Sequence, residues 1–310
     1  MNWTERRELL TRAGGFVGEA LCNKLLSLRA NVTGYELVRP RRLVKFPVVF
    51  GSVTNYTALC FLMSTKKIDV VYHLAAQALV TTANKLPMST FETNIKGTWC
   101  VLEACRHEAV SKVVAASSDK CYGTPISLPY TEEHRLQASA PYDVSKACAD
   151  MIAQSYFKSF ALPVRITRCA NIYGPGDTSP TRLIPQTIAS ILKNEEPVIR
   201  SDGKFERDYM YIDDAVNAYI KLAEADGKAN GEAFNFGTNK PVSVIQIVEQ
   251  ILDLMKSNLK YIVMNQVTNE IKGQSLDWSK AKHYLNWKPE IELKDGLRKT
   301  IEWHRTLSRG

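Results

Sequence analysis

The sequence predicts an α/β protein with a doubly wound parallel sheet and a smaller C-terminal lobe. In the first half, short runs rich in β-branched residues alternate with longer segments of helical period. This alternation is typical of a parallel sheet that is covered by helices. Beyond about residue 170, loops rich in glycine, proline and aspartate separate the helical segments. No low-complexity linker divides the sequence, so we expect the second lobe to pack tightly on the first.

Each strand is predicted from a short apolar run, and each helix from apolar residues that recur at three- and four-residue steps. The first strand is short, because only Leu9 and Leu10 precede Thr11, behind the charged residues 5–8. The other strands of the first half are predicted at residues 31–35, 48–50, 70–74, 113–117 and 164–168. The helices are predicted at residues 16–28, 55–65, 91–102, 142–160, 183–193, 213–225, 244–256 and 293–307.

The composition is that of an ordinary globular chain, with 310 residues of which 45% are apolar and 23% charged. The formal net charge of +8 is diffuse, and its one dense cluster (Arg39, Arg41, Arg42 and Lys45) has no interleaved aromatic residues, which argues against nucleic-acid binding. No apolar run approaches the roughly 20 residues that span a bilayer, and the N-terminus lacks a secretory stretch. The seven cysteines form no CxxC pair, which favours reduced thiols over a metal site. We therefore expect a cytoplasmic protein without membrane, nucleic-acid or metal partners.

A glycine-rich turn lies where the first strand would lead into the first helix. It starts at Thr11 and continues through Gly15, Phe16, Val17 and Gly18. Glycines at such a turn let the backbone approach a pyrophosphate, whose charge the free amides at the helix N-terminus stabilise. The turn therefore predicts a dinucleotide site in a Rossmann-like sheet.

The acidic residue Glu36 follows Gly18 by 18 residues, at the end of the second predicted strand. A carboxylate there would bind a ribose diol and repel a 2′-phosphate, so it favours NAD. The arginines just downstream could instead pair with the phosphate of NADP. We predict NAD, with NADP as the alternative.

Polar residues follow the strand at 113–117. Ser118, Asp119 and Lys120 would face a ligand, because ligands of open α/β sheets bind at the carboxyl ends of the strands. Tyr142 and Lys146 are four residues apart and therefore share one face of a helix. An adjacent ammonium group is expected to lower the pKa of the Tyr142 phenol, so that it can accept the proton of a sugar hydroxyl while a nicotinamide takes up hydride.

Together these motifs resemble a known family. The chain carries, in order, the turn 11–18, His73-Leu-Ala-Ala-Gln77, Asn94 before Gly97-Thr98, Tyr142-x-x-x-Lys146 and Arg207-Asp208-Tyr209. This set, which runs through nearly the whole chain, resembles the extended short-chain dehydrogenase/reductases of the NAD-dependent epimerase/dehydratase family. Their substrates are nucleotide sugars. Ser118-Asp119-Lys120 is similar to the CDP-glucose 4,6-dehydratase branch, since other dehydratases carry Asp-Glu there.

The resemblance implies an NAD-binding domain at 1–170 and a nucleotide-sugar-binding lobe at 171–310, from which some segments return to the first domain. NAD would contact the glycine turn, Glu36, Tyr142, Lys146, Leu74, Ala75, Ala76 and Asn94. The nucleotide sugar would contact Asn171, Arg182, Leu183, Arg207, Asn269 and Glu270. A homodimer is implied, with the helices that carry Trp99 and Met151 at its interface.

The family mechanism assigns a role to each catalytic candidate. Tyr142 removes the proton of the C4 hydroxyl, whose oxygen Ser118 binds. Asp119 is the acid for the water that leaves C6, and Lys120 is the candidate base at C5. The product is a 4-keto-6-deoxy nucleotide sugar.

Two departures from the pattern keep other functions open. Arg12 stands where the family turn has glycine, and Ser52 where an aspartate commonly meets the adenine amine. One alternative is a nucleotide-sugar 4-epimerase, although an epimerase needs no acid at C6 and so has no use for Asp119. The other is a non-catalytic relative with a damaged cofactor turn, which the complete set of catalytic residues opposes.

Overall fold

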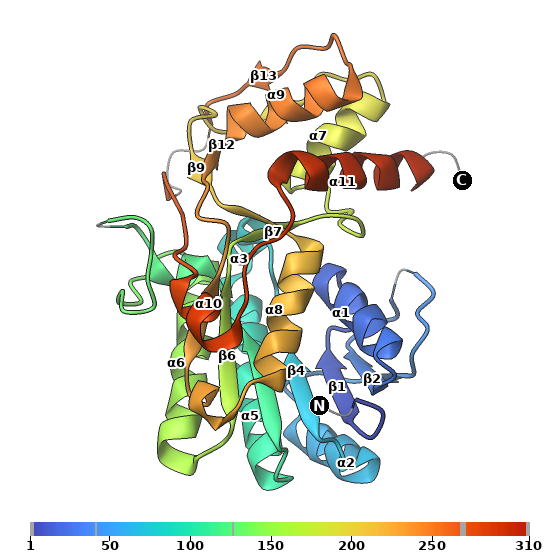
Figure 1. Cartoon of the computed structure of the whole chain (residues 1–310), viewed down its shortest axis with the longest axis vertical. Coiled ribbons are helices and arrows are strands. Elements are labelled where there is room, and N and C mark those ends of the chain that lie inside the picture. Colours follow the sequence, from blue (N-terminus) through green and yellow to red (C-terminus); the bar gives the residue numbers. More distant parts are fainter. Residues whose placement is uncertain (1–2, 41, 126, 267–270, 308–310) are drawn as a thin grey trace.

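A seven-stranded parallel sheet forms the centre of the computed structural model, which describes residues 3–40, 42–125, 127–266 and 271–307 (Figure 1). The strand order is β11-β6-β5-β4-β1-β2-β3, and every neighbouring pair is parallel. The strands are β1 (Arg7–Thr11), β2 (Asn31–Glu36), β3 (Val48–Phe50), β4 (Val70–His73), β5 (Lys112–Ala116), β6 (Val164–Cys169) and β11 (Ala233–Phe236). The predicted doubly wound α/β fold is confirmed.

Helices cover both faces of this sheet. One face carries α1 (Phe16–Ser27) and α8 (Ile212–Glu224), and the other carries α2 (Tyr56–Lys66), α5 (Gly97–His107) and α6 (Pro141–Phe160). Each face has its own hydrophobic core: Leu10 belongs to the first and Leu9 to the second, and both side chains are fully buried. Because neighbouring residues of a strand point to opposite faces, a continuous apolar run suits a sheet buried on both sides.

The order of the strands reverses at β1, which pairs with β2 on one side and β4 on the other. Chain connections therefore leave its carboxyl end in opposite directions, and in open α/β sheets the ligand-binding crevice is expected at such a point. The carboxyl ends of β4 and β5 border the same crevice.

A second group of elements lies above the carboxyl edge of the sheet (Figure 1). Its helices are α7 (Leu183–Leu192), α9 (Val244–Met255) and α11 (Leu293–Leu307), which contact one another. Three small sheets accompany them: β7 (Asn171–Tyr173) with β10 (Tyr209–Tyr211), β9 (Glu206–Arg207) with β12 (Val242–Ser243), and β8 (Val198–Ile199) with β13 (Ile262–Val263). The shorter helices are α3 (Val80–Lys85), α4 (Pro87–Phe91), a π-helical turn (Glu92–Lys96), α10 (Ser279–Leu285) and 3₁₀ turns at Asp119–Tyr122 and Gly227–Ala229.

The structure contains several elements that the sequence did not predict, among them α3, α10 and the two-residue strands β8, β9, β12 and β13. β11 was not predicted, although it pairs with β6 and extends the main sheet. β7, which was not predicted as a separate strand, ends at Tyr173, where the glycine- and proline-rich loop was expected to begin, and it pairs with β10. The first strand is longer than expected, because it includes the charged residues Arg7 and Glu8. Each has a partner of opposite charge: Arg7 bonds Asp69 at 2.7 Å, and the fully buried Glu8 lies 3.0 Å from Arg6.

Within the described ranges, every helix is too short or too polar to cross a lipid bilayer.

The buried Glu8 should make stability depend on pH. Burial raises its pKa from 4.5 to about 7, so between these values the folded chain keeps a proton that the unfolded chain has lost. The free energy of unfolding should therefore fall as the pH rises from about 4.5 to about 7. We expect Glu8→Gln to gain up to roughly 3 kcal/mol on the parent across this window. Urea unfolding at pH 4.5, 6 and 8 measures this, with the exposed Glu302→Gln as control. Parallel pH profiles for Glu8→Gln and the parent would contradict it.

Candidate active site

Thr11, at the carboxyl end of β1, ties the glycine turn to the neighbouring strand. Its Oγ1 accepts the N–H groups of Leu74 and Ala75, at 3.0 Å each, and lies 3.0 Å from Nδ1 of His73. The other ring nitrogen of His73 lies 3.1 Å from Oγ1 of Thr98. Burial, then the charge of Lys146, lower the pKa of His73 to about 3, so this imidazole is a neutral packing group.

Tyr142 and Lys146 lie in the first turns of α6, which Pro141 opens. Both side chains are buried, and Nζ of Lys146 donates to the carbonyl oxygen of Ala116, at the end of β5, over 2.8 Å. Burial, followed by the repulsion of Arg12, lowers the pKa of Lys146 to about 8.

The expectation that Lys146 lowers the pKa of Tyr142 is wrong for this structure. Burial and then the negative charge of Asp119 raise that pKa to about 12, and a hydrogen bond with Ser118 opposes the rise. The cost of placing a phenolate away from water outweighs the neighbouring cations.

Ser118, Asp119 and Lys120 follow β5 in one 3₁₀ turn. The hydroxyl of Ser118 donates to Oδ1 of Asp119 at 3.0 Å and accepts the N–H of Lys120. Oδ2 of Asp119 is buried and has no hydrogen-bond partner among the described residues. A buried carboxylate oxygen without a partner is costly, and a ligand hydroxyl would satisfy it.

The side chain of Lys120 bridges the two halves of the molecule. Its ammonium lies 3.3 Å from Oδ1 of Asp119, 3.4 Å from Oδ1 of Asn171 and 3.1 Å from Oε1 of Gln274. Gln274 is buried, and its amide nitrogen has no partner within the described part of the chain. Sequence reasoning missed Gln274, since a lone glutamine in a C-terminal loop carries no motif.

The glycine turn offers partners for a dinucleotide. Gly15 is the N-cap of α1 and has no side chain to cap the helix. The first backbone amides of α1 are therefore available to a ligand. Glu36, at the end of β2, accepts the N–H of Gly14. Phe16 and Val17 form the first turn of α1, and Gly18 is so close to the carbonyl of Arg12 that a Cβ there would overlap it. These residues could hold an adenosine ribose and a pyrophosphate.

Asn94 holds the wall of the crevice. Its Oδ1 accepts the N–H of Gln77 at 2.7 Å, and its Nδ2 donates to the carbonyl of Gln77 and, over 2.8 Å, to Oγ of Ser145 on α6. Asn94 thus connects the segment after Ala76 to the helix of Tyr142. Ser52 is turned to its own loop, where its hydroxyl bonds that of Thr54.

The candidates for the second ligand are scattered. Arg182 pairs with Asp177 at 3.0 Å and packs over the ring of Phe16, next to the glycine turn, and Leu183 follows it as the first residue of α7. Arg207 donates to the carbonyl of Glu206 at 2.9 Å and lies on a different sheet. Asn269 and Glu270 lie outside the described residues.

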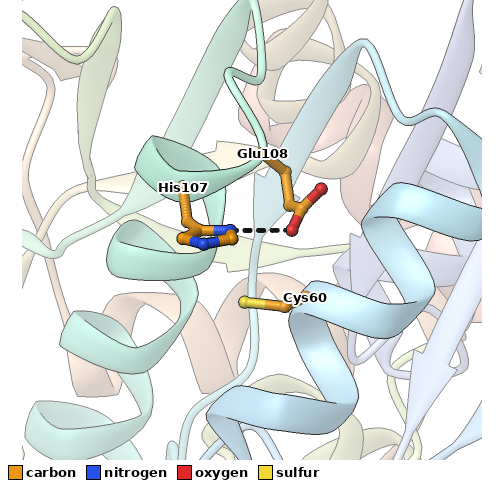
Figure 2. Close-up of side chains that lie close together, drawn as sticks. All are labelled: Cys60, His107 and Glu108. Carbon is orange, nitrogen blue, oxygen red and sulfur yellow. Dashed lines mark hydrogen bonds and ion pairs between the residues drawn. The ribbon is translucent and has the colours of Figure 1, made fainter.

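One group of possible metal ligands occurs among the described residues. Figure 2 shows Cys60 of α2 directed toward His107 and Glu108 at the end of α5, and their ligand atoms lie within 4.8 Å of one another. The group supplies three ligand atoms where structural zinc sites take four, and Nδ1 of His107 is already bonded to Glu108 at 2.9 Å. None of the three residues contributes to the crevice described above.

Comparison with known proteins agrees with this geometry. The family model described as "NAD dependent epimerase/dehydratase family" matches residues 9–237. Human dTDP-D-glucose 4,6-dehydratase is 30% identical over 97% of this chain and 90% of its own length. CDP-glucose 4,6-dehydratase of Salmonella typhimurium is 28% identical over 99% of this chain and 93% of its own.

Solved structures of both activities share the fold. UDP-glucose 4-epimerase of Thermotoga maritima, solved with UDP-glucose, aligns with a TM-score of 0.93 at 26% identity, over 97% of this chain and 99% of that chain. dTDP-glucose 4,6-dehydratase of Bacillus anthracis, solved with NAD, aligns with a TM-score of 0.87 at 26% identity, over 98% of both chains.

The position of α6 should depend on a buried ion pair. Asp150 receives two hydrogen bonds of 2.9 Å from Arg168 on β6, and both side chains are almost wholly buried. Asp150→Asn would leave the guanidinium uncompensated, so we expect a loss of about 3–5 kcal/mol in the free energy of unfolding. The exposed Asp295→Asn, which also loses an arginine partner, should cost under ~1 kcal/mol. Equal losses in urea unfolding would contradict this prediction.

Proposed function

The chain belongs to the NAD dependent epimerase/dehydratase family, and on that premise we propose that it is a nucleotide-sugar 4,6-dehydratase acting on a CDP-glucose-like substrate. The observation that carries the proposal is the setting of Asp119. This buried carboxylate adjoins Tyr142 and has one oxygen without a partner among the described residues. It also lies 3.3 Å from the ammonium of Lys120. A carboxyl and an amine beside the tyrosine suit a reaction that moves protons at two further carbon positions.

The first step falls to Tyr142. As a phenolate, Tyr142 would take the proton of the sugar C4 hydroxyl, while Ser118, hydrogen-bonded with Tyr142, would hold the C4 oxygen. Because burial raises the pKa of Tyr142 to about 12, the phenolate needs the nearby positive charges of Lys146 and of a bound nicotinamide. Bound NAD would accept the hydride from C4 and later return it to C6. Lys146, held by the carbonyl of Ala116, places its positive charge where it can orient a nicotinamide ribose.

The dehydration steps fall to Asp119 and Lys120. The ketone at C4 acidifies the C5 proton, and Lys120 would remove that proton. Asp119 would protonate the C6 hydroxyl as it leaves as water. Both roles require that a proton first passes from the Lys120 ammonium to the Asp119 carboxylate, 3.3 Å away, which makes Lys120 a neutral amine and Asp119 a carboxylic acid. Elimination of water then returns the pair to ammonium and carboxylate. The bonds of Lys120 to Asn171 and Gln274 keep its ammonium at the junction of the two halves of the molecule, where the sugar would lie.

NAD is the cofactor that the crevice favours. Glu36 places a carboxylate at the end of β2, where it would accept hydrogen bonds from a ribose diol and repel a 2′-phosphate. Arg42 is engaged elsewhere: it donates to the carbonyl of Gly176 at 3.1 Å and stacks on Trp303. The structure of the Bacillus anthracis relative was solved with NAD, which supports NAD as the cofactor.

The two halves of the chain would bind different parts of the reaction complex. Residues 1–170, joined by β11, would bind NAD, and residues 171–310 would bind the nucleotide with Asn171, Arg182, Leu183, Arg207, Asn269 and Glu270. The relative from Salmonella typhimurium supports CDP-glucose as the substrate. A homodimer is supported by exposed apolar side chains on neighbouring helices: Met88 is 83%, Trp99 41% and Met151 60% exposed.

A nucleotide-sugar 4-epimerase is the second candidate, favoured by the alignment with the Thermotoga maritima enzyme. Incubation with CDP-glucose, dTDP-glucose, UDP-glucose and GDP-mannose separates the two. A dehydratase should give a 4-keto-6-deoxy product, which absorbs ultraviolet light in alkali, from one of these donors. A C4 epimer without that absorption would replace the dehydratase proposal by the epimerase.

The role of Lys120 can be tested by substitution. Lys120→Met should lower the rate of 4-keto-6-deoxy product formation by at least ~100-fold, because no base removes the C5 proton. Oxidation at C4 should continue, so reduced nicotinamide should be detectable by its absorbance. Lys272→Met, the same change at an exposed lysine near Gln274, should leave the rate unchanged. Product formation by Lys120→Met at the parent rate would remove Lys120 from the mechanism.

A further inference from the structure

Arg12 has a backbone conformation that suits glycine. Its φ of 59° lies in the left-handed region, where a side chain is unfavourable. Hydrogen bonds nevertheless hold it there: its N–H donates to Tyr35 at 2.9 Å, and its carbonyl accepts the N–H of Gly15 at 3.1 Å. The same carbonyl lies so close to Gly18 that a side chain at position 18 would overlap it. The backbone at Arg12 therefore has a conformation typical of glycine, and this conformation fixes the direction in which the Arg12 side chain points.

The side chain of Arg12 crosses the crevice. It folds over Gly15, where a Cβ would lie 3.0 Å from its Cγ and 3.2 Å from its Nε. Its Nη1 then donates to the carbonyl oxygen of Ala76, in the segment after β4. The guanidinium thus joins the two walls of the crevice and covers the start of α1, where a pyrophosphate would meet the free amides.

The charged groups around the Arg12 guanidinium show that it lies between the residues expected to bind the two ends of a dinucleotide. Arg12 interacts with Glu36 at one end and with Tyr142 at the other. It also repels Lys146, and Arg182 lies near enough to lower the pKa of Arg12 itself. A dinucleotide that extends from Glu36 to Tyr142 would have to pass through the volume that the Arg12 side chain fills.

We propose that Arg12 bars the dinucleotide cleft, so that NAD binds only after the Arg12–Ala76 hydrogen bond breaks and the side chain swings out. The inference rests on the proposed function, because it takes the cofactor to be a dinucleotide. Its consequence is that the parent protein binds NAD more weakly than its other cofactor-site residues would allow. Arg12, and not Glu36 or the helix N-terminus, then sets the affinity for the cofactor.

Two substitutions separate the side chain from the backbone. Arg12→Gly removes the bar and relaxes the left-handed backbone, whereas Arg12→Ala removes the bar and keeps the unfavourable φ. Arg29→Gly is the matched control, since Arg29 also has a positive φ (66°) but is exposed after the end of α1. The dissociation constant for NAD is measured by titration calorimetry on nucleotide-free protein.

We expect Arg12→Gly and Arg12→Ala to bind NAD at least about tenfold more tightly than the parent, the order expected when one charged hydrogen bond need no longer break. Arg29→Gly should bind like the parent. NAD binding by both Arg12 variants that is equal to or weaker than that of the parent would overturn the inference. Tighter NAD binding by Arg12→Gly alone would also overturn it, because the effect would then come from the backbone and not from the side chain.

The same titrations distinguish the inference from the proposed function. Tight binding of NAD by the parent, without a gain in the variants, overturns the role of Arg12 and leaves an NAD-dependent enzyme. Absence of binding in all four proteins, Arg12→Gly included, overturns both.

Discussion

The hydroxyl of Thr11 holds the point from which the two halves of the sheet diverge. β1 lies between β4 and β2, and Oγ1 of Thr11 accepts two backbone N–H groups from the residues that follow β4. These bonds fix how the chain leaves β4, and so they set the distance between the glycine turn and the segment that contains Ala76. The crevice for a ligand exists because parallel strands end at one edge while their connections leave in opposite directions. Every candidate residue for chemistry takes its place from that edge.

Burial opposes charge throughout this crevice. It raises the pKa of Tyr142 and lowers those of Lys146 and Arg12, and the three side chains lie close enough to influence one another. A buried site that contains several cations is electrostatically unfavourable without an anion. A pyrophosphate brings the opposite charge, so once the Arg12 side chain has moved out of the cleft it would favour the charged form of Lys146. The electrostatics of the site and the proposed anionic ligands therefore support each other.

Function in this family depends on small differences at a shared site. Dehydratases and epimerases both align with the chain over nearly its whole length. In the proposed mechanism Tyr142 and Lys146 would serve either reaction, so they do not discriminate between the two. In the proposed mechanism the discriminating groups are Asp119 and Lys120, which would act at C6 and C5. Of the two, Lys120 bonds partners from the second half of the chain, Asn171 and Gln274. The proposal of a dehydratase thus depends on a few atoms after β5.

The sequence by itself determined strands β1 to β6 and the chain positions of the chemical groups, because most buried strands and helix starts are local patterns. The apolar runs before His73 and Ser118, and Pro141 before Tyr142, predicted β4, β5 and the start of α6 to within a residue or two. Only the tertiary structure decided which groups meet. β11, whose residues 233–236 include no β-branched side chain, gave no local strand signal. Gln274 reaches Lys120 from 154 residues away, and the pKa of Tyr142 follows from burial that no local pattern reports. The direction of the Arg12 side chain is of the same kind, because the carbonyl that it binds belongs to the segment after β4, 64 residues away in the sequence.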